Sequence, residues 1–447
     1  MTHQIVNDKA IEIKRDCEQM IKPFQVANTH QQDIAIIGGG LASAHLALSL
    51  AQRGKSVRVF CKDSELAQGA SGNKQGALYP LLTPENDLLS QFFQQAFLFS
   101  RSRVQQLVAD GYQVSHDFCG VLQTGYNERS TDRLNKILKS QDWPADVVRS
   151  VSAAEADQIA GVEINKQAAF YPLGGWVCPA ELTKALFLKA QSLSDVHIEF
   201  NCEIHTLEQN NHGWQLQSGS HTLGPFENVV NACGSDLINF HQTQHIPASN
   251  FRGQVSHIPT RNKLSQMKTV LCAHGYITPK HNQMHCMGAS YVKDDNNREY
   301  LVEEQLGNLH KMQQSFATDD TRTHWIDDID ISGHSARVGV RLVTRDHFPM
   351  LGLAPNYSKI VEQQQSLDKN NKKQAADYWR QTQPAYYQGL YILGALGSRG
   401  LCSGALAAET LACMLCNETP PLSEDYLEKM NPNRLWLRKL IKNRPIY

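Results

Sequence analysis

Three small residues near the start of the chain have the spacing of a nucleotide-binding turn. Gly38 and Gly40 are followed by Ser43, and Gly39 lies between the two glycines. In such a turn the first glycine allows a tight bend and the second lets a pyrophosphate approach the backbone; the third position is a small residue. The N–H groups at the start of the following helix then bind phosphate. We therefore predict a dinucleotide site at this turn.

The surrounding residues predict the strands and the helix that must position the turn. Residues 33–38 are a β-branched apolar run, typical of a buried parallel strand. Residues 41–53 are apolar at helical spacing, and residues 56–61 predict a second strand, which completes a βαβ unit. An acidic residue about 20 positions after the turn binds ribose in such units. Asp63 is the nearest carboxylate, and a solvated turn residue is the alternative for it.

The composition is that of an ordinary globular protein. The 447 residues include 43 Lys+Arg and 44 Asp+Glu, which predicts two or three domains and excludes a global positive field for nucleic acid. A nucleic-acid partner therefore requires a local basic patch. The segment 431–447 offers such a patch, or else is a solvated tail that ends a helix. It has no carboxylate, includes Trp436, and carries the cations Arg434, Arg438, Lys439, Lys442 and Arg444.

We expect no membrane span, no secretion signal and no metal site. Glycines, His45 and Arg399 interrupt the long apolar stretches, and the N-terminus lacks the apolar core of a signal peptide. The eleven cysteines, such as Cys61, Cys233, Cys272 and Cys402, are scattered mostly in apolar runs, as in a soluble cytoplasmic protein. Two further patterns could suggest a metal but lack additional ligands. They are the CxxC of Cys413 and Cys416 in an expected core helix, and the pair His281 and His285.

The rest of the chain predicts a mixture of helices and short strands. Helical patterns occur at 88–107, 179–190, 303–315 and 401–416, and strand-like runs at 196–207, 213–217, 228–233 and 390–393. Residues 247–300 alternate as in an antiparallel sheet. We expect short strands and turns at 114–146 and a surface insertion at 362–383.

Six separated segments, taken together, resemble one enzyme superfamily. They are GGGLASA (38–44), GASGNKQGALYP (69–80), VVNACG (229–234), RGQVSH (252–257), GVRLVTRDHFPMLG (339–352) and GALGSRGL (394–401). Their order is similar to that of the motifs of the FAD-dependent D-amino-acid-oxidase and glycine-oxidase superfamily. The resemblance implies FAD as cofactor and an α/β fold, with a Rossmann-type FAD-binding domain and a discontinuous antiparallel-sheet substrate domain.

The division into domains that we expect has three parts. An N-terminal extension covers 1–32; the FAD-binding domain comprises 33–110, 150–246 and 331–447; the substrate domain comprises 111–149 and 247–330.

Within this superfamily the chain resembles the oxidoreductase half of the bifunctional tRNA 5-methylaminomethyl-uridine biosynthesis enzymes. The segments that carry this resemblance are GASGNKQGALYPLL, FYPLGGWVCPAEL (170–182), GSRGLCS and NPNRLWLRKLIK (431–442). It implies FAD-dependent removal of the carboxymethyl group from 5-carboxymethylaminomethyl-(2-thio)uridine at the tRNA wobble position. The implied products are 5-aminomethyl-(2-thio)uridine and glyoxylate. Since few residues precede the first strand, we expect no methyltransferase domain here, and a separate methyltransferase could act on the product.

The resemblance also implies roles for two arginines, our predicted catalytic residues. Arg341 stands where the glycine-oxidase relatives have an arginine that pairs with the substrate carboxylate, and a guanidinium fork suits a fixed anion clamp. A structural ion pair with Asp346 is the alternative. Arg399 matches a second arginine, which could contact substrate or flavin. Tyr276 and Tyr291 could line the substrate pocket or only pack within a sheet.

The same resemblance implies which residues hold FAD. A polar, glycine-spaced loop would follow the pyrophosphate and the isoalloxazine ring, unless it is a surface turn. The turn before the last helix would direct N–H groups at the flavin pyrimidine oxygen, which is anionic in reduced flavin. The predicted FAD ligands are Gly38, Gly39, Gly40, Ser43, Asp63, Ser71, Gly72, Asn73, Gln75, Gly76, Gly234, Gly397, Ser398, Gly400 and Leu401.

Two other functions remain open at this point. The same motifs would serve an FAD-dependent oxidase or dehydrogenase of a free amine such as glycine, sarcosine or a D-amino acid. A flavin-containing RNA-binding protein without turnover would lack a carboxylate clamp, so Arg341 and Arg399 disfavour it. The electron acceptor, the particular tRNAs and the oligomeric state do not follow from the sequence.

Overall fold

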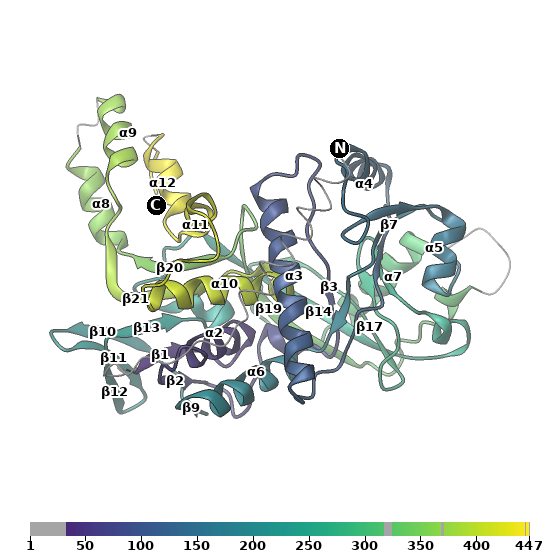
Figure 1. Ribbon diagram of the computed structural model, residues 1–447, viewed down its shortest axis with the longest axis horizontal. Coiled ribbons are helices and arrows are strands. Elements are labelled where there is room, and N and C mark those ends of the chain that lie inside the picture. The colour runs from purple at the N-terminus through teal and green to yellow at the C-terminus, as the bar shows by residue number, and fades with distance from the viewer. Residues whose placement is uncertain (1–32, 317–323, 368–370, 443, 447) are drawn as a thin grey trace.

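The computed structural model describes residues 33–316, 324–367, 371–442 and 444–446. Two lobes lie side by side, with the parallel sheet at the left of Figure 1 and the large antiparallel sheet at the right. The predicted N-terminal extension, residues 1–32, is outside the described residues. The predicted α/β fold class is confirmed.

The left lobe is built on a six-stranded sheet in the order β20-β21-β13-β1-β2-β9. β1 pairs in parallel with β2 and with β13, and β2 pairs in parallel with β9. The predicted βαβ unit around the glycine turn is therefore confirmed. The strands are β1 (Ile34–Ile37), β2 (Val57–Phe60), β9 (Val196–Glu199), β13 (Asn228–Asn231), β20 (Met350–Pro355) and β21 (Tyr386–Gly394).

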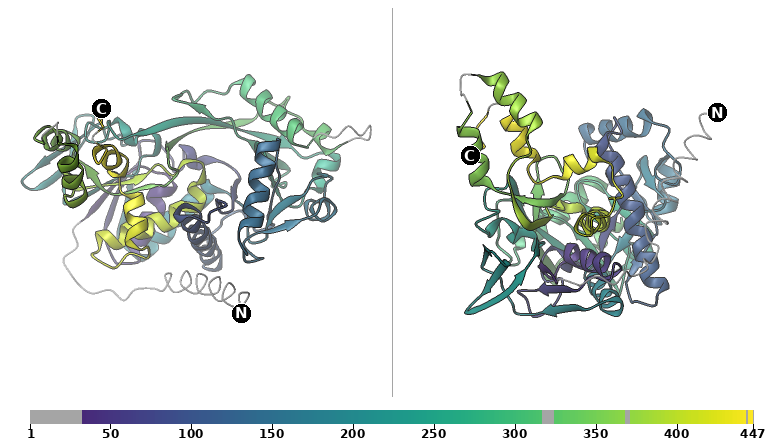
Figure 2. Two further views of the ribbon diagram at one scale, coloured as in Figure 1. Left: turned by 90° about the horizontal axis from the view of Figure 1, so that it is seen from above. Right: turned by 60° about the vertical axis from the view of Figure 1, so that its left-hand side comes forward.

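Helices rich in alanine and leucine cover one face of this sheet. α10 packs against both α2 and α3, and α2 also packs against α6; the right view of Figure 2 shows α10 between α2 and α3. On the other face, Trp214 and Leu216 of a small sheet share a core with β1 and β13 residues. These elements are α2 (Leu41–Ala51), α3 (Leu88–Ala109), α6 (Pro179–Leu193), α10 (Gly400–Leu415), β10 (Thr206–Asn210), β11 (Gly213–Ser218) and β12 (His221–Phe226).

The right lobe is built on a nine-stranded sheet in the order β18-β14-β17-β16-β15-β5-β7-β6, with β19 also paired to β14. Its strands are β5 (Val121–Gln123), β6 (Arg149–Val151), β7 (Ala168–Tyr171), β14 (Ala248–Pro259), β15 (Val270–Cys272), β16 (Tyr276–Ile277), β17 (Met284–Gly288), β18 (Val292–Lys293) and β19 (Ala336–Thr344). A fourth sheet has β8 (Gly175–Val177) between β3 (Gly76–Leu78) and β4 (His116–Asp117). The right-lobe helices are α4 (Glu128–Ser140), α5 (Ala153–Ala160) and α7 (Val302–Phe316).

Sheet membership changes two predicted domain boundaries. β6 and β7 pair with each other and β7 pairs with β5, so residues 149–171 belong to the substrate sheet. β19 likewise pairs along its whole length with β14. The prediction had placed both segments in the FAD-binding domain. Strand pairing between distant segments decides these boundaries, and composition does not reveal them.

Two segments that were assigned to short strands and turns or to a surface insertion contain helices. Residues 114–146 include α4, which begins with a capping box between Asn127 and Ser130. Residues 362–383 overlap α8 (Tyr357–Gln365) and α9 (Lys372–Gln381). Trp379 of α9 is only 1% exposed in the core that it shares with Trp436, so this segment is more than a surface insertion. The last helices are α11 (Glu424–Met430) and α12 (Arg434–Leu440).

Candidate active site

A cavity of about 930 Å³ runs from the first glycine turn to the edge of the substrate sheet. Its walls come from the turn after β1, the loop before β3, the turn before α10, and the segments that follow β15 and β17. This volume is at the upper end for small-molecule sites, as a dinucleotide requires. Both lobes therefore contribute to one site.

The first turn leaves no room for side chains on its inner side. Gly38 has φ +124°, and a Cβ there would lie 2.6 Å from the carbonyl oxygen of Ala232. A Cβ on Gly39 would lie 2.4 Å from Sγ of Cys61. Gly40 lines the cavity and starts α2 without an acidic first turn; the N–H of Leu41 donates to the Ser71 hydroxyl at 2.9 Å, and the next N–H groups of the first turn are available to a phosphate. This cradle fits the pyrophosphate of FAD.

Most of the other predicted FAD ligands also line the cavity. They are Asp63, Ser71, Asn73, Gly76, Gly234, Gly397, Ser398, Gly400 and Leu401. Gly397 has φ +58°, and α10 begins without a side-chain cap, so its N–H groups are available to an anionic group. The backbone N–H donors at the starts of α2 and α10 therefore suit the pyrophosphate and the flavin ring of FAD.

Three predicted FAD ligands do not line the cavity. Ser43 is buried against the strand, with its hydroxyl 3.4 Å from the carbonyl oxygen of Ala232. A Cβ on Gly72 would meet the guanidinium of Arg337, which donates to backbone carbonyls of the same loop. Gln75 is 1% exposed and uses its amide group on Thr278 and Pro279. In this structure the hydroxyl of Ser43 and the amide of Gln75 contact other protein groups, and Gly72 leaves space for Arg337.

Arg341 lies at the substrate end of the cavity without a carboxylate partner among the described residues. Burial lowers the pKa of its guanidinium, and the other groups that influence this pKa are Tyr276 and Tyr291. A Cβ on Gly253 would lie 2.5 Å from Nη1 of Arg341, so this glycine provides the space for the guanidinium. The alternative pairing with Asp346 is wrong.

Arg399 lies in the same region of the cavity but has protein partners. Its Nη1 donates to the carbonyl oxygen of Tyr79 at 3.0 Å, and its guanidinium carbon lies 4.6 Å from the centroid of the Tyr79 ring. Burial acts to lower the pKa of Arg399, but Tyr79, Cys402 and Tyr171 leave it raised. Arg399 therefore holds a fixed positive charge in the wall.

Four more side chains line the substrate end. Tyr276 and Tyr291 are among them, as the sequence analysis had considered. His274 and Lys311 had not been singled out, because no motif marks them. Lys311 donates to the carbonyl oxygen of Ala289 at 2.9 Å, and burial lowers its pKa.

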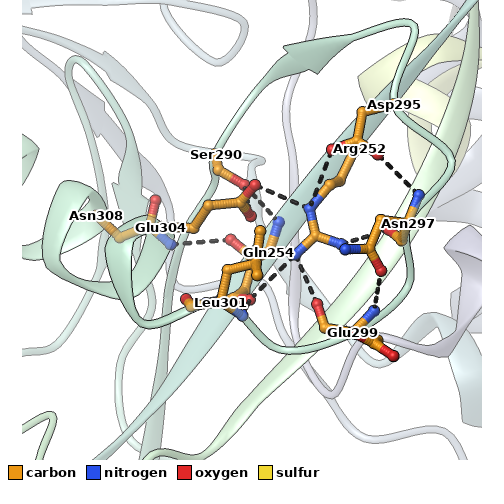
Figure 3. Close-up of polar contacts among 9 residues, drawn as sticks. All are labelled: Arg252, Gln254, Ser290, Asp295, Asn297, Glu299, Leu301, Glu304 and Asn308. Carbon is orange, nitrogen blue, oxygen red and sulfur yellow. Dashed lines mark hydrogen bonds and ion pairs between the residues drawn. The ribbon is translucent and has the colours of Figure 1, made fainter.

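A polar network around Arg252, Ser290 and Glu304 holds the segment that follows β17 in place (Figure 3). Arg252 is fully buried, pairs with Glu304 at 2.8 Å, and donates to backbone carbonyls of Asn297 and Glu299. Glu304 also accepts from the hydroxyl of Ser290 at 2.6 Å. Because these bonds join β14, the segment 290–301 and α7, they position the chain that carries Tyr291.

The predicted RNA-binding tail is only partly exposed. Arg434 is 4% exposed and makes a bidentate ion pair with Asp346, with distances of 2.9 and 3.1 Å. Trp436 is buried and its ring contacts Tyr357. Arg434 therefore cannot meet a phosphate without breaking this pair, so its assignment is wrong. The other four tail cations are exposed: Arg438, which also pairs with Asp346, Lys439, Lys442 and Arg444.

The cysteines and the histidine pair considered as metal ligands show no metal-site geometry among the described residues. The ten described cysteines are all free; Cys61, Cys272 and Cys402 are buried, but Cys233 is only half-buried. Both ring nitrogens of His285 are hydrogen-bonded, to Thr278 and Thr260. No group of three or more potential metal ligands occurs among the described residues. Nor does the described part of the chain contain a helix long and apolar enough to span a membrane.

A family model described as "FAD dependent oxidoreductase" matches residues 33–414. The chain belongs to this family. As an FAD-dependent oxidoreductase it uses FAD, and the glycine cradle and the two uncapped helix starts described above are consistent with that cofactor.

Relatives of this flavoenzyme are found among both sequences and structures. It is 54% identical over 437 residues to the "tRNA 5-methylaminomethyl-2-thiouridine biosynthesis bifunctional protein MnmC" of Shewanella oneidensis, and 52% identical over 445 residues to the protein of that name from Shewanella sediminis. Each match covers 95% of this chain and 62% of the relative. Thus the chain spans less than two thirds of these relatives.

Solved structures share the fold. Glycine oxidase from Geobacillus kaustophilus has a TM-score of 0.70 at 19% identity, covering 89% of this chain and 98% of that one. L-proline dehydrogenase from P. horikoshii has a TM-score of 0.69 at 15% identity, covering 92% of this chain and 100% of that one.

Proposed function

We propose that this flavoenzyme removes the carboxymethyl group from 5-carboxymethylaminomethyl-(2-thio)uridine at the tRNA wobble position. The products are 5-aminomethyl-(2-thio)uridine and glyoxylate. The observation that carries the proposal is Arg341, a half-buried cation at the end of the cavity with no carboxylate partner among the described residues. A substrate carboxylate would complete this pair. The names of the Shewanella relatives support a modified tRNA uridine as the rest of the substrate.

The structure of this substrate makes the oxidation chemically accessible. Its side chain is a secondary amine, and the carbon next to the nitrogen also bears a carboxylate. Bound FAD supplies a hydride acceptor for that carbon. Water then hydrolyses the substrate imine to the amine and glyoxylate, so the chain needs no covalent nucleophile.

The roles that we propose for the chain are binding and orientation. Arg341 holds the carboxylate with two N–H groups. Tyr276 and Tyr291 flank this guanidinium and would orient the group that it binds. Arg399, held on Tyr79, contacts the substrate or the flavin edge. Each of these residues lines the same cavity.

Contacts with tRNA outside the cavity are also proposed. Arg438, Lys439, Lys442 and Arg444 are exposed and would meet phosphates. The cytoplasm is the proposed location, and a separate methyltransferase acting on the product stays a prediction.

The test uses tRNA that carries the carboxymethylaminomethyl group. Purified FAD-loaded protein is incubated with this tRNA under air and with an artificial electron acceptor, and the digested nucleosides are compared by mass. We expect loss of the carboxymethyl group and release of glyoxylate. The matched control is Gly40→Val, because its Cβ would point toward Ser71 at 3.2 Å in the phosphate cradle and should prevent FAD binding. Unchanged nucleosides with fully loaded wild-type protein would exclude the proposal.

Oxidation of a free small amine is the competing function, since Arg341 could bind the carboxylate of glycine or sarcosine equally well. The same preparation is therefore assayed with glycine, sarcosine and D-amino acids. Efficient turnover of one of these, together with unmodified tRNA, would favour the competing function.

A further inference from the structure

Helix α4 begins beside the substrate end of the cavity. β5 and β15 are parallel neighbours, and the register aligns Gln123 with Cys272. Because parallel strands end at the same sheet edge, the segments after these two strands emerge together. The segment after β15 carries His274 into the cavity wall, and the segment after β5 carries Tyr126 and then α4.

An aromatic stack joins the cavity wall to this helix. The rings of Tyr126 and His274 are 4.4 Å apart between centroids and are inclined by only 7°. Tyr126 nevertheless remains 37% exposed. It is therefore a fixed aromatic surface at the edge of the cavity, with a face or edge open to a ligand.

The exposed face of α4 carries cations at helical spacing. Arg129, Arg133 and Lys136 are all exposed, and none forms an ion pair with a carboxylate in the described part of the chain. Glu128 and Asp132 lie among them on the same helix. From Arg129 to Lys136 the helix rises by roughly 10 Å, a length that matches about three phosphates of one strand. The opposite face is anchored in the core by Leu134 and Ile137.

We propose that Tyr126 and the α4 face, defined as Arg129, Arg133 and Lys136, form a docking surface for the anticodon arm of tRNA. The cations bind phosphates, and Tyr126 stacks on a base next to the nucleotide that enters the cavity. Recognition of a base in an RNA loop commonly combines these contacts. This inference rests on the proposed function, because it takes the wobble uridine as the group that reaches Arg341.

The α4 face is independent of the predicted C-terminal contact. In Figure 1, α4 belongs to the right lobe, whereas α12 lies with α8 and α9 in the left lobe. A tRNA could therefore be held at two separate places, and each can be removed without the other.

The main test is the variant Arg129→Gln/Arg133→Gln/Lys136→Gln. Glutamine preserves helix propensity, so α4 should remain folded. We expect weaker tRNA binding and a salt dependence flattened by about 2 in the log–log slope, since each lost contact to a single strand removes roughly 0.7. Asp132→Asn, which removes a negative charge from the same face, should strengthen binding. The matched control Lys184→Gln/Lys268→Gln removes two exposed cations from other elements and should change neither quantity.

Tyr126→Ala tests the stacking contact separately. We expect KM for tRNA to rise about 10-fold, from stacking energies of roughly 1–3 kcal/mol per base. Oxidation of the free modified nucleoside should be unchanged in the α4 triple variant, because its three side chains do not line the cavity.

The outcomes separate this inference from the proposed function. Conversion of tRNA by the wild type, with wild-type affinity and salt slope in the triple variant, would overturn the docking surface and leave the function intact. An equal effect of the lysine control would also overturn it. If the wild type neither binds nor converts the modified tRNA, both proposals fail.

Discussion

Arg103 is buried and Arg341 is half-buried in the wall of the cavity, and their surroundings differ. Arg103 in α3 is 3% exposed and pairs with Glu409 of α10 at 3.0 Å, while its other Nη donates to Ser49. Glu409 also pairs with Arg53 at 2.7 Å. Arg341 has tyrosines and a glycine around it and no described carboxylate. Arg103 has its counter-charge within the protein, whereas Arg341 is placed to bind an anion from outside it.

Two other arginines are buried and, like Arg103, pair with carboxylates. Arg252 pairs with Glu304, and Arg434 pairs with Asp346. Removing a charge from water without a counter-charge is costly. An arginine that lacks a carboxylate partner at the end of a cavity therefore indicates an anionic ligand. The structural pairs should therefore govern stability, whereas Arg341 should govern turnover.

The largest effect is expected from Glu409→Gln. It leaves Arg103 buried without a counter-charge, so the free energy of unfolding should fall by about 3–5 kcal/mol. Urea unfolding at saturating FAD measures this change, with Arg341→Met as the control that should not lose stability. A loss below about 1 kcal/mol would mean that water or a shifted side chain replaces the pair.

The next effect is expected from Arg341→Lys. Lysine keeps the charge but loses the two-pronged geometry, so kcat/KM for the modified tRNA should fall by about 10- to 100-fold, or roughly 1–3 kcal/mol. Arg341→Ala should lose at least as much, while FAD content and the melting temperature stay unchanged. Wild-type kinetics in both variants would show that the carboxylate is bound elsewhere.

Acid should reduce the stability that Glu409 contributes through its pairs with Arg103 and Arg53. Burial alone would raise the pKa of Glu409, but Arg103 and Arg53 hold it below the usual value of 4.5. A carboxylate with a depressed pKa stabilises the fold above the unfolded-state pKa, and this contribution is lost as the pH falls through the folded-state pKa. The stability difference between wild type and Glu409→Gln should therefore shrink below about pH 4.5. A difference that stays constant down to about pH 3 would contradict this assignment.

The smallest effect concerns the tail. Neutralising Arg438, Lys439, Lys442 and Arg444 together should flatten the salt dependence of tRNA binding by roughly 0.7–0.9 per lost phosphate contact, without changing FAD content. Arg434→Gln is the contrasting control, because it breaks a buried pair and should lower the melting temperature instead. Wild-type affinity and salt slope in the four-site variant would remove the tail from the RNA site.

Some features missed in the sequence had a local signal. α4 has Asn127 at its start, Ser130 three positions later, and Leu134 and Ile137 on one face, a recognisable amphipathic helix. The short strands β5 and β6 on either side of α4 favoured a prediction of strands and turns for the whole segment. By contrast, His274 and Lys311 had no local signal, since each reaches the cavity through strand pairing or helix packing over long chain distances.

The sequence by itself determined the strand, glycine turn and helix at the start of the FAD-binding domain. The turn at Gly38 requires a positive φ and close contact with a neighbouring backbone, so its glycines, strand and helix are readable as one unit. The roles of the arginines depended on the tertiary structure. Arg434 and Arg341 both lie in predicted functional motifs, yet only folding brings Asp346 to Arg434, 88 positions away in the chain, and leaves Arg341 without a described carboxylate. A charge is structural or functional according to which counter-charge lies within a few ångströms, and that distance is set by packing between distant segments.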